Sequence, residues 1–443
     1  MAKNIKNVDV IISGGGLSGC LMALSLAKLT QADGSSLSIA IVEANLSPLQ
    51  KEQQTSQAAP HKTPHKTPHK TSPQNNTSPL FDDRVLALSH GSAAYLAKLG
   101  AWQHITHHAC AIERIDVSDR GHYGKARLKA KDHHVTALGY VIEMSSIGKG
   151  LLKELSTKNN IHWFNPDSIM DITWQSAEDV NKVSVELKSG QTLAASLLLA
   201  CDGANSPCRQ LANIKVDHSD YQQVALIANV ATEQAHQNKA FERFTEFGPL
   251  AMLPLSQLNG QNRCSLVWTM PPEQSDAMLT LTDEAFAKQL ELAFGSWLGA
   301  ITQVGKRDVY PLVLLQAQQQ TYHRMALIGN ASHTIHPIAG QGFNLGLRDV
   351  MLMAKLITKS LSTNININAN KGTNKDIGSF ALLNEYAQQR QLDQKQVIEL
   401  TDSLVTLFAN DLPPLIAARN ISLKVMNYIS PIKNTLVNKF MGY

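Results

Sequence analysis

The chain has 443 residues, of which 43% are hydrophobic and 17% are charged, and its formal net charge is +4. These values are typical of a folded globular protein and exclude a chain that is disordered throughout. The length favours a large domain with a smaller second one, because a single core rarely grows so far. The small, scattered positive charge argues against nucleic acid as a partner.

The cysteines point to a reducing, cytoplasmic compartment, because none has the spacing of a metal site or of a disulfide framework. The N-terminus runs directly into a short apolar strand, so no secretion signal is predicted. No apolar run approaches the roughly 18 residues that cross a bilayer, and membrane contact is expected to be peripheral at most. The five cysteines are Cys20, Cys110, Cys201, Cys208 and Cys264.

The first predicted elements are a strand over residues 8–13, a glycine turn, a helix with one apolar face formed by Leu17, Leu21 and Leu24, and a strand over residues 37–42. Such a βαβ unit opens a doubly wound, Rossmann-like α/β domain. The fold class is therefore predicted as α/β.

The glycine turn fits the dinucleotide fingerprint G-x-G-x-x-G through Gly14, Gly16 and Gly19. Free N–H groups at the start of the helix bind a pyrophosphate there. Glu43 ends the next strand, near the separation of about 20 residues expected for the acid that binds the adenosine ribose. An adenine dinucleotide is predicted, but this fingerprint alone does not distinguish FAD from NAD.

Residues 47–79 are rich in Gln, Ser, Thr, Pro, His and Lys and contain three copies of Pro-His-Lys-Thr. Such a segment cannot bury a core, so a disordered insertion is predicted. His61, His65 and His69 in these repeats can hold a metal only loosely. No metal site is assigned to them.

Two later strands, residues 197–200 and 325–328, close on Asp202-Gly203 and Gly329-Asn330. Between them lie three strand-like runs, which predict a β-rich substrate domain. Trp268 and Met270 on the last run are expected to be core or pocket lining. The three runs are residues 224–230, 250–255 and 264–270.

The end of the chain is predicted to be helical. Residues 363–378 are rich in Asn and Gly and predict a loop, and residues 382–408 show helical apolar spacing. The amphipathic tail up to residue 443 is interpreted as a packing or partner surface.

Two segments that follow these strands resemble the flavin motifs of flavoprotein aromatic hydroxylases. Residues 202–209 resemble their D-G-x-x-S-x-x-R segment, and residues 329–333 resemble their second flavin segment. The longest match is the run of residues 336–349. Three further runs are similar to the hydroxylases of ubiquinone biosynthesis, especially the bacterial 2-polyprenyl-6-methoxyphenol hydroxylases. They are residues 81–89, 115–122 and 138–143.

This resemblance covers nearly the whole chain except residues 47–79 and implies an FAD-dependent monooxygenase. Its co-substrates would be NAD(P)H and dioxygen, which act through a flavin 4a-hydroperoxide on the ring of a small hydrophobic prenylated phenol. It also suggests two kinds of partner, a ubiquinone-biosynthesis multiprotein complex and the surface of the inner membrane. Two alternatives stay open, a non-catalytic flavin-binding scaffold and a flavin reductase or epoxidase that acts on an isoprenoid chain.

The resemblance also implies site residues. Asn330 stands where the family has an Asp on the ribityl chain, so the stronger charge-assisted hydrogen bond is lost there. His336, Pro337 and Gly340 would be catalytic, in the turn that faces the flavin ring. Cofactor contacts are implied for Arg84, Asp202, Gly203, Gly329, Asn330, Gly340, Gln341, Gly342, Phe343 and Asn344.

Structural roles remain open for some of these residues. Arg84 can instead be a surface ion-pair partner, and His333 and His336 can be histidines satisfied by the fold. Arg120 and His122 are interpreted as exposed charges at a hairpin tip.

The resemblance divides the chain into an FAD-binding domain, an inserted β-rich substrate domain and a C-terminal helical region. The FAD-binding domain is assigned to residues 1–88, 143–212 and 322–362. The substrate domain is assigned to residues 89–142 and 213–321, and the C-terminal helices to residues 379–443.

Overall fold

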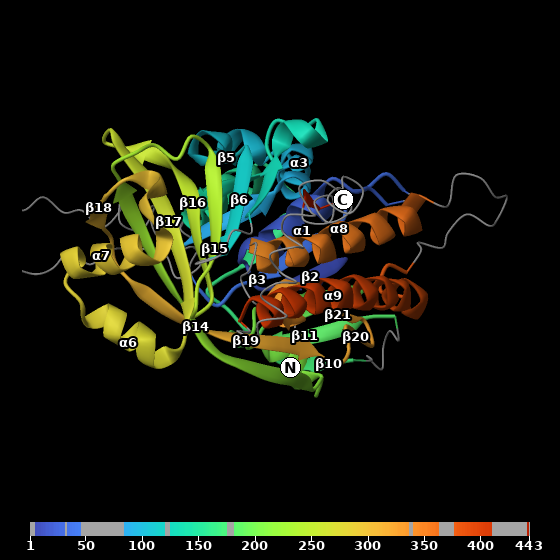
Figure 1. The fold of residues 1–443 in the computed structure, drawn as a ribbon. Helices are drawn as coiled ribbons and strands as arrows, with labels where there is room; N and C mark the ends of the chain where they lie inside the picture. Colours follow the sequence, from blue (N-terminus) through green and yellow to red (C-terminus); the bar gives the residue numbers. More distant parts are fainter. Residues whose placement is uncertain are drawn as a thin grey trace, which may run out of the picture.

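A six-stranded sheet lies at the centre of one half of the computed structural model (Figure 1). Its order is β20-β21-β13-β2-β3-β9, and all neighbours are parallel except β20 and β21. Parallel strands buried on both faces need continuous apolar runs, which these segments have. The strands are β2 (Val10–Ser13), β3 (Ile39–Val42), β9 (Ile161–Phe164), β13 (Leu197–Ala200), β20 (Thr321–Tyr322) and β21 (Met325–Leu327). The structure describes residues 5–31, 33–45, 84–119, 125–174, 181–335, 340–362, 376–409 and 441–442.

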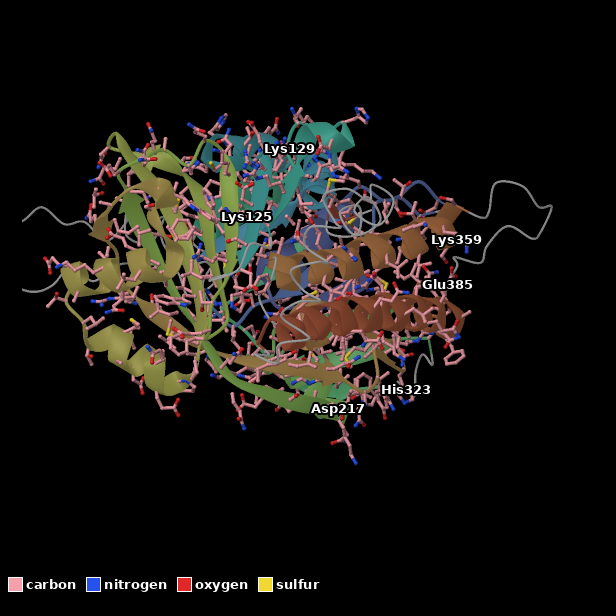
Figure 2. All side chains as sticks on the ribbon, viewed as in Figure 1. Lys125, Lys129, Asp217, His323, Lys359 and Glu385 are labelled. Atoms are coloured by element: carbon pink, nitrogen blue, oxygen red, sulfur yellow. The ribbon has the colours of Figure 1, made fainter. Side chains whose placement is uncertain are left out.

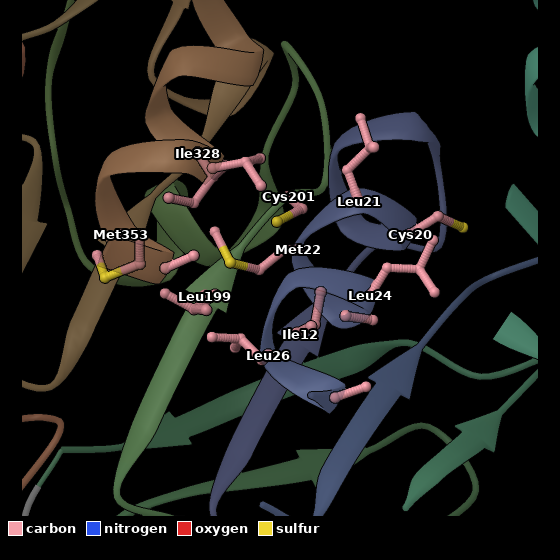
Figure 3. Close-up of a cluster of buried hydrophobic side chains, with 14 of the residues drawn as sticks. Ile12, Cys20, Leu21, Met22, Leu24, Leu26, Leu199, Cys201, Ile328 and Met353 are labelled. Atoms are coloured by element: carbon pink, nitrogen blue, oxygen red, sulfur yellow. The ribbon is translucent and has the colours of Figure 1, made fainter. Parts of the chain in front are cut away.

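Helices from both ends of the chain pack beside this sheet. Figure 3 shows Met22 of the first helix and Met353 of a late helix in one apolar cluster with Leu199 of β13. The first helix has buried side chains on every side, because α4 and α8 both pack against it. The prediction of a single apolar face was therefore wrong. The helices are α1 (Leu17–Ala27), α4 (Met144–Leu155), α8 (Gln341–Ser362) and α9 (Phe380–Ala409).

The other half is built on a nine-stranded sheet, ordered β22-β19-β14-β17-β16-β15-β6-β7 with β18 paired to β14. Two helices, α6 (Pro272–Thr280) and α7 (Asp283–Phe294), cover its outer face (Figure 1). The strands are β6 (Arg114–Asp119), β7 (Lys125–Lys129), β14 (Val216–Thr232), β15 (Lys239–Phe244), β16 (Pro249–Leu258), β17 (Gln261–Met270), β18 (Ile301–Val304), β19 (Asp308–Ala317) and β22 (His333–Thr334).

Two small sheets complete the described part of the fold, together with short helical turns. The three-stranded sheet contains β4 (Val85–Ser89), β8 (Gly139–Glu143) and β5 (Cys110–Ile112), and α3 (His90–Leu99) follows β4. The four-stranded sheet contains β1 (Ile5–Asn7), β12 (Thr192–Ala195), β11 (Val183–Leu187) and β10 (Ile169–Thr173). The turns are α5 (Pro207–Leu211), η1 (Trp102–His104), η2 (Thr106–His108), η3 (Ala130–His133), η4 (Ser296–Leu298) and η5 (Gly329–Ala331).

The predicted fold class is confirmed. The predicted strands correspond to β2, β3, β13, β14, β16, β17 and β21, and the late helix to α9. Trp268 and Met270 are buried in the core under α6 and α7, as expected. The predicted insertion, most of the Asn-rich loop and nearly all of the amphipathic tail lie outside the described residues. The domain boundaries stay a prediction.

Within the described part of the chain, none of the helices combines the length and the apolar character needed to span a membrane. All five cysteines are buried as free thiols.

Candidate cofactor and active site

The six-stranded sheet has a topological switch point between β2 and β13. From β2 the chain continues to β3 on one side, whereas β13 and β21 lie on the other side. Ligands of doubly wound sheets bind in the crevice at such a point, outside the carboxyl ends of the strands. Gly14 follows β2 and Asp202 follows β13, so two predicted cofactor residues lie at this crevice.

The glycines of the first turn are required for different reasons. A Cβ on Gly14 would lie 2.5 Å from the carbonyl oxygen of Cys201, and one on Gly19 would lie 1.9 Å from that of Gly14. These two glycines therefore allow close packing of strand and helix. Gly16, the N-cap of α1, has an ordinary φ of −70°, and a Cβ there would have no atom of a described residue within 4 Å apart from its chain neighbours. Because the protein itself does not require glycine here, the open space fits a pyrophosphate at the helix N-terminus.

Glu43 is fixed at the end of β3. Its Oε2 accepts a hydrogen bond from the Gly15 N–H at 2.7 Å, and its Oε1 accepts from the Asn45 N–H at 2.9 Å and the Asn45 side chain at 3.1 Å. A carboxylate has about four acceptor positions, so these bonds leave one for a ribose hydroxyl.

Asp202 carries an acceptor atom that lacks a protein partner. Its Oδ2 accepts a hydrogen bond from the Cys208 N–H at 3.1 Å and lies 3.4 Å from the Ser13 hydroxyl. Its Oδ1 is buried and has no hydrogen-bond partner among the described residues. A buried acceptor without a donor is costly, so the crevice fits a ligand that supplies hydroxyl donors. Beside it, a Cβ on Gly203 would meet nothing within 4 Å.

The starts of α1, η5 and α8 converge on the same crevice. A Cβ on Gly329 would lie 2.8 Å from the Ser18 hydroxyl, and one on Gly346 would lie 3.1 Å from the Gly329 Cα. Asn330 is exposed, and a Cβ on Gly342 would meet no described residue within 4 Å. Helices α1 and α8 thus both contact η5 at Gly329, and each offers free N–H groups at its N-terminus to negative charge.

Arg209 joins the two motif loops. Its side chain is buried and donates hydrogen bonds to the carbonyl oxygens of Ala331, at 2.8 Å, and Ala204, at 2.7 Å. The Ser206 hydroxyl in turn accepts from the Arg209 N–H at 3.0 Å. The loop after β13 and the turn after β21 are therefore held at a fixed separation.

The buried ion pair between Asp349 and Arg390 anchors η5. The Oδ2 of Asp349 accepts from the Gly329 N–H at 2.7 Å, and its Oδ1 accepts from the Arg390 Nε at 2.6 Å. Burial alone would lower the pKa of Arg390, but Asp349, Tyr386 and Asp393 raise it above its usual value. The Tyr386 hydroxyl donates to the Leu327 carbonyl at 2.9 Å. Helix α9 thus holds the second motif through α8 and β21.

His333 belongs to this buried support. Its Nδ1 lies 3.0 Å from the Gln394 Nε2 and 3.8 Å from the Asp349 Oδ2. Burial lowers the pKa of His333, so the ring is neutral and its Nδ1 accepts from the Gln394 amide. Its Nε2 is buried and has no hydrogen-bond partner among the described residues, so the fold satisfies only one of the two ring nitrogens.

Asn344 is buried, and its amide is used fully by the protein. Its Oδ1 accepts from the Ser89 N–H at 2.9 Å and the Ser92 hydroxyl at 2.7 Å. Its Nδ2 donates to the carbonyl oxygens of Ala87, at 2.8 Å, and Gly340, at 2.7 Å. The first turn of α8 is therefore clamped against β4.

Among the remaining predicted residues, the structure describes Arg84 and Phe343. The Arg84 guanidinium lies 5.2 Å from the centre of the Tyr310 ring, and Phe343 packs against the central core. His336 and Pro337 lie outside the described residues, and so does the side chain of Gln341. Within the described ranges, no group of three or more His, Cys, Asp or Glu side chains is arranged to hold a metal ion.

Sequence reasoning missed the support from α9. Asp349 was part of the matched run but received no role, and Arg390 was not singled out. A charged residue among the apolar positions of a predicted helix is the signal that could have identified Asp349.

Comparison with known proteins agrees with this geometry. The family described as "FAD binding domain" matches residues 89–369. The chain belongs to the FAD-binding aromatic hydroxylases. The expected flavin cofactor and the monooxygenase class are thereby confirmed.

Relatives extend over nearly the whole chain. The ubiquinone hydroxylase UbiL of Rhodospirillum rubrum is 30% identical over 99% of this chain and 90% of its own. The human ubiquinone biosynthesis monooxygenase COQ6 is 28% identical over 97% of this chain and 91% of its own.

Solved structures share the fold of this flavin hydroxylase. The p-nitrophenol 4-monooxygenase of Pseudomonas putida superimposes with a TM-score of 0.69 at 17% identity, over 99% of each chain. HpxO of Klebsiella pneumoniae, in complex with FAD and uric acid, superimposes with a TM-score of 0.66 at 14% identity, over 98% of this chain and 97% of its own.

Proposed function

We propose that this protein hydroxylates the aromatic ring of a polyprenyl phenol in ubiquinone biosynthesis, using FAD, NAD(P)H and dioxygen. The relatives that act in ubiquinone biosynthesis support this pathway. The buried Oδ1 of Asp202, which has no partner among the described residues and lies beside the glycine turn that opens α1, carries the proposal. Together with the free N–H groups at the starts of α1 and α8, it would bind a pyrophosphate, a polyhydroxyl chain and an anionic ring edge.

In this proposal each predicted residue has a place along the dinucleotide. Gly14, Gly16 and Gly19 form the pyrophosphate turn, and Glu43 binds the ribose. The ribityl chain is faced by Asp202, Gly203, Gly329 and Asn330. Gly342 has no side chain, so the flavin ring can approach the N-terminus of α8. Gly340, with His336 and Pro337, lines the reacting edge, near Arg84, Gln341 and Phe343. Asn344 acts by positioning Gly340, because all four of its hydrogen bonds go to protein.

FAD, when bound, supplies the transfer of electrons from NAD(P)H to dioxygen and of one oxygen atom to the ring. The protein contributes orientation, the positive ends of two helices, and exclusion of water from the reacting edge. A cytoplasmic location is part of the proposal. So are contacts with the membrane surface and with a ubiquinone-biosynthesis complex, because a polyprenyl chain favours lipid.

The test is turnover of the purified, FAD-loaded protein with 2-prenylphenol as probe. We expect NADH or NADPH oxidation that depends on the phenol and a product heavier by one oxygen atom. The methyl ether 2-prenylanisole, which has no hydroxyl proton, serves as a control. Flavin binding without phenol-dependent oxidation would support a scaffold, and oxygen in the prenyl chain would support an epoxidase.

A further inference from the structure

The nine-stranded sheet has two unlike faces. On the outer face, the side chains of Leu226, Leu266 and Trp268 are fully or almost fully buried under α6 and α7. The inner face packs against the three-stranded sheet, which lies beside the flavin site. The Arg263 guanidinium pairs with Glu143 at the end of β8, at 3.2 Å. Val85 of β4 packs in the same cluster as Leu253 and Leu255 of β16.

A second contact lies on the other side of this inner face, where Arg84 stacks on Tyr310 of β19. Between the two contacts, one row of paired residues crosses five strands of the sheet. Each residue in this row keeps some exposed surface, although the strands are interior ones. The row contains Val117, Glu242, Ala251, Val267 and Ile227. These five positions form an apolar surface with one carboxyl group, and the row continues on β19 to Asp308, which pairs with Lys306.

The direction of the Glu242 side chain follows from its neighbours on β15. The Phe241 ring packs on Phe294 of α7 with ring centroids 5.4 Å apart, and the Arg243 guanidinium lies 5.5 Å from the centre of the Trp297 ring. Both neighbours point to the outer face. Because side chains alternate along a strand, Glu242 points to the inner face, toward the flavin site.

The environment of Glu242 is unusual for a carboxyl group. It has no hydrogen bond or ion pair with any described residue, and burial raises its pKa to about 7. Other charged or titratable groups of this face are Asp119, Asp308, Tyr310, Arg84 and the Arg263–Glu143 pair. None of them contributes to the shift, which comes from desolvation alone. Glu242 is nevertheless partly exposed, so a hydrogen-bond donor from outside can reach its carboxyl group in these apolar surroundings.

We propose that Glu242 is a catalytic residue that contacts the substrate and accepts the proton of its phenol hydroxyl group during ring hydroxylation. This inference rests on the proposed function. The O–H bond of the phenol breaks, and its proton forms a new O–H bond on the carboxylate. The electron pair left on the phenol oxygen moves into the ring as the ring carbon binds one oxygen atom of the activated dioxygen. The O–O bond breaks, and its electron pair stays on the second oxygen atom, which ends as water. The proton then returns to the phenol oxygen when that carbon loses its hydrogen to water as a proton.

The energetics match this role. A phenol has a pKa of about 10, so a base with an ordinary carboxyl pKa accepts its proton poorly. The raised pKa of Glu242 narrows the gap while the group is still largely ionised above pH 7. The apolar neighbours of the row suit the ring and the first part of a prenyl chain.

The experiment compares Glu242→Gln and Glu242→Asp with a control, Glu273→Gln, which removes an exposed carboxylate on the far side of the sheet. In the FAD-loaded enzyme with 2-prenylphenol, wild type and control should gain kcat/KM as pH rises through about 7. Glu242→Gln should lose about 100-fold in kcat, together with this pH dependence. Glu242→Asp should keep the pH dependence at a lower rate.

A second readout needs neither cofactor nor substrate. The pKa of Glu242 is higher in the folded than in the unfolded protein, so the wild type should lose Tm relative to Glu242→Gln as pH rises from about 4.5 to about 7. Parallel Tm profiles, or an unchanged kcat and pH profile in Glu242→Gln, would overturn the role of Glu242. Absence of hydroxylation by wild type and control would instead contradict the proposed function, and the catalytic role with it.

Discussion

The two loops that frame the cofactor crevice are stabilised in different ways. The turn before α1 is held mainly within one βαβ unit, since Gly14 packs on Gly19 and Glu43 accepts from Gly15, with a further contact between Gly14 and Cys201. The turn η5 is held from far away, because Asp349 binds Gly329 and is itself paired with Arg390 of α9. One half of the site is thus encoded locally, whereas the other half depends on tertiary packing. The glycine turn can be tested without disturbing the fold, whereas the buried anchor of η5 cannot.

The largest effect is expected from Arg390→Met, which removes the partner of Asp349. The Asp349 side chain is fully buried, so its charge would remain without compensation. We expect a loss of about 3–5 kcal/mol in the free energy of unfolding, measured by urea titration of the apoprotein. FAD binding should weaken as well, because Gly329 loses its anchor.

A matched control is Lys359→Met, which breaks another ion pair between α8 and α9. Figure 2 labels Lys359 and Glu385, whose charged atoms lie 3.4 Å apart near the surface. We expect this change to cost less than about 1 kcal/mol. Equal losses in the two variants would contradict the supporting role of the buried pair.

Gly16→Val tests the local half of the comparison. Apart from its chain neighbours, no described residue has an atom within 4 Å of the position of a Cβ, so the apoprotein should unfold at nearly the wild-type temperature. The added side chain would instead fill the place of the pyrophosphate, and FAD affinity should fall by about 100-fold or more. Fluorescence titration of the apoprotein measures it, and full flavin retention would refute the placement.

Substitutions of Asn330, which is exposed on η5, test the half of the site that depends on tertiary packing. Asn330→Asp should keep FAD affinity, because a carboxylate has nearly the same shape and accepts hydrogen bonds more strongly. Asn330→Leu should weaken FAD by about 5- to 150-fold, equivalent to about 1–3 kcal/mol, by leaving a ribityl hydroxyl without a partner. If the affinities of wild type and both variants agree, Asn330 does not contact the cofactor.

The smallest effect is expected from replacing residues 47–79 with a flexible linker of about ten residues. The free energy of loop closure changes by only about 0.6 kcal/mol for each factor of two in length. Melting temperature and flavin content of the purified variant should stay near those of the wild type. A much lower melting temperature, or loss of flavin, would mean that the segment is structural.

What the sequence could predict follows the same division. The turn at Gly14 and its acid Glu43 could be identified because their spacing is set within one βαβ unit. The Arg390–Asp349 pair could not, since no local pattern reveals which buried charges meet across two helices. The role of Glu242 could not be predicted for a related reason. Its apolar surroundings come from four neighbouring strands, and only the register of these strands shows which side chains lie beside it.

Arg209 has a consequence for the affinity of the site. Because its guanidinium donates to carbonyl groups on both motif loops, neither loop can move alone without breaking one of these hydrogen bonds. A dinucleotide bound across both loops therefore meets a preorganised surface and loses less free energy to ordering the chain. Replacing this two-sided donor with a single ammonium group would retain the charge but uncouple the loops, and the lost affinity would appear mainly as faster cofactor dissociation.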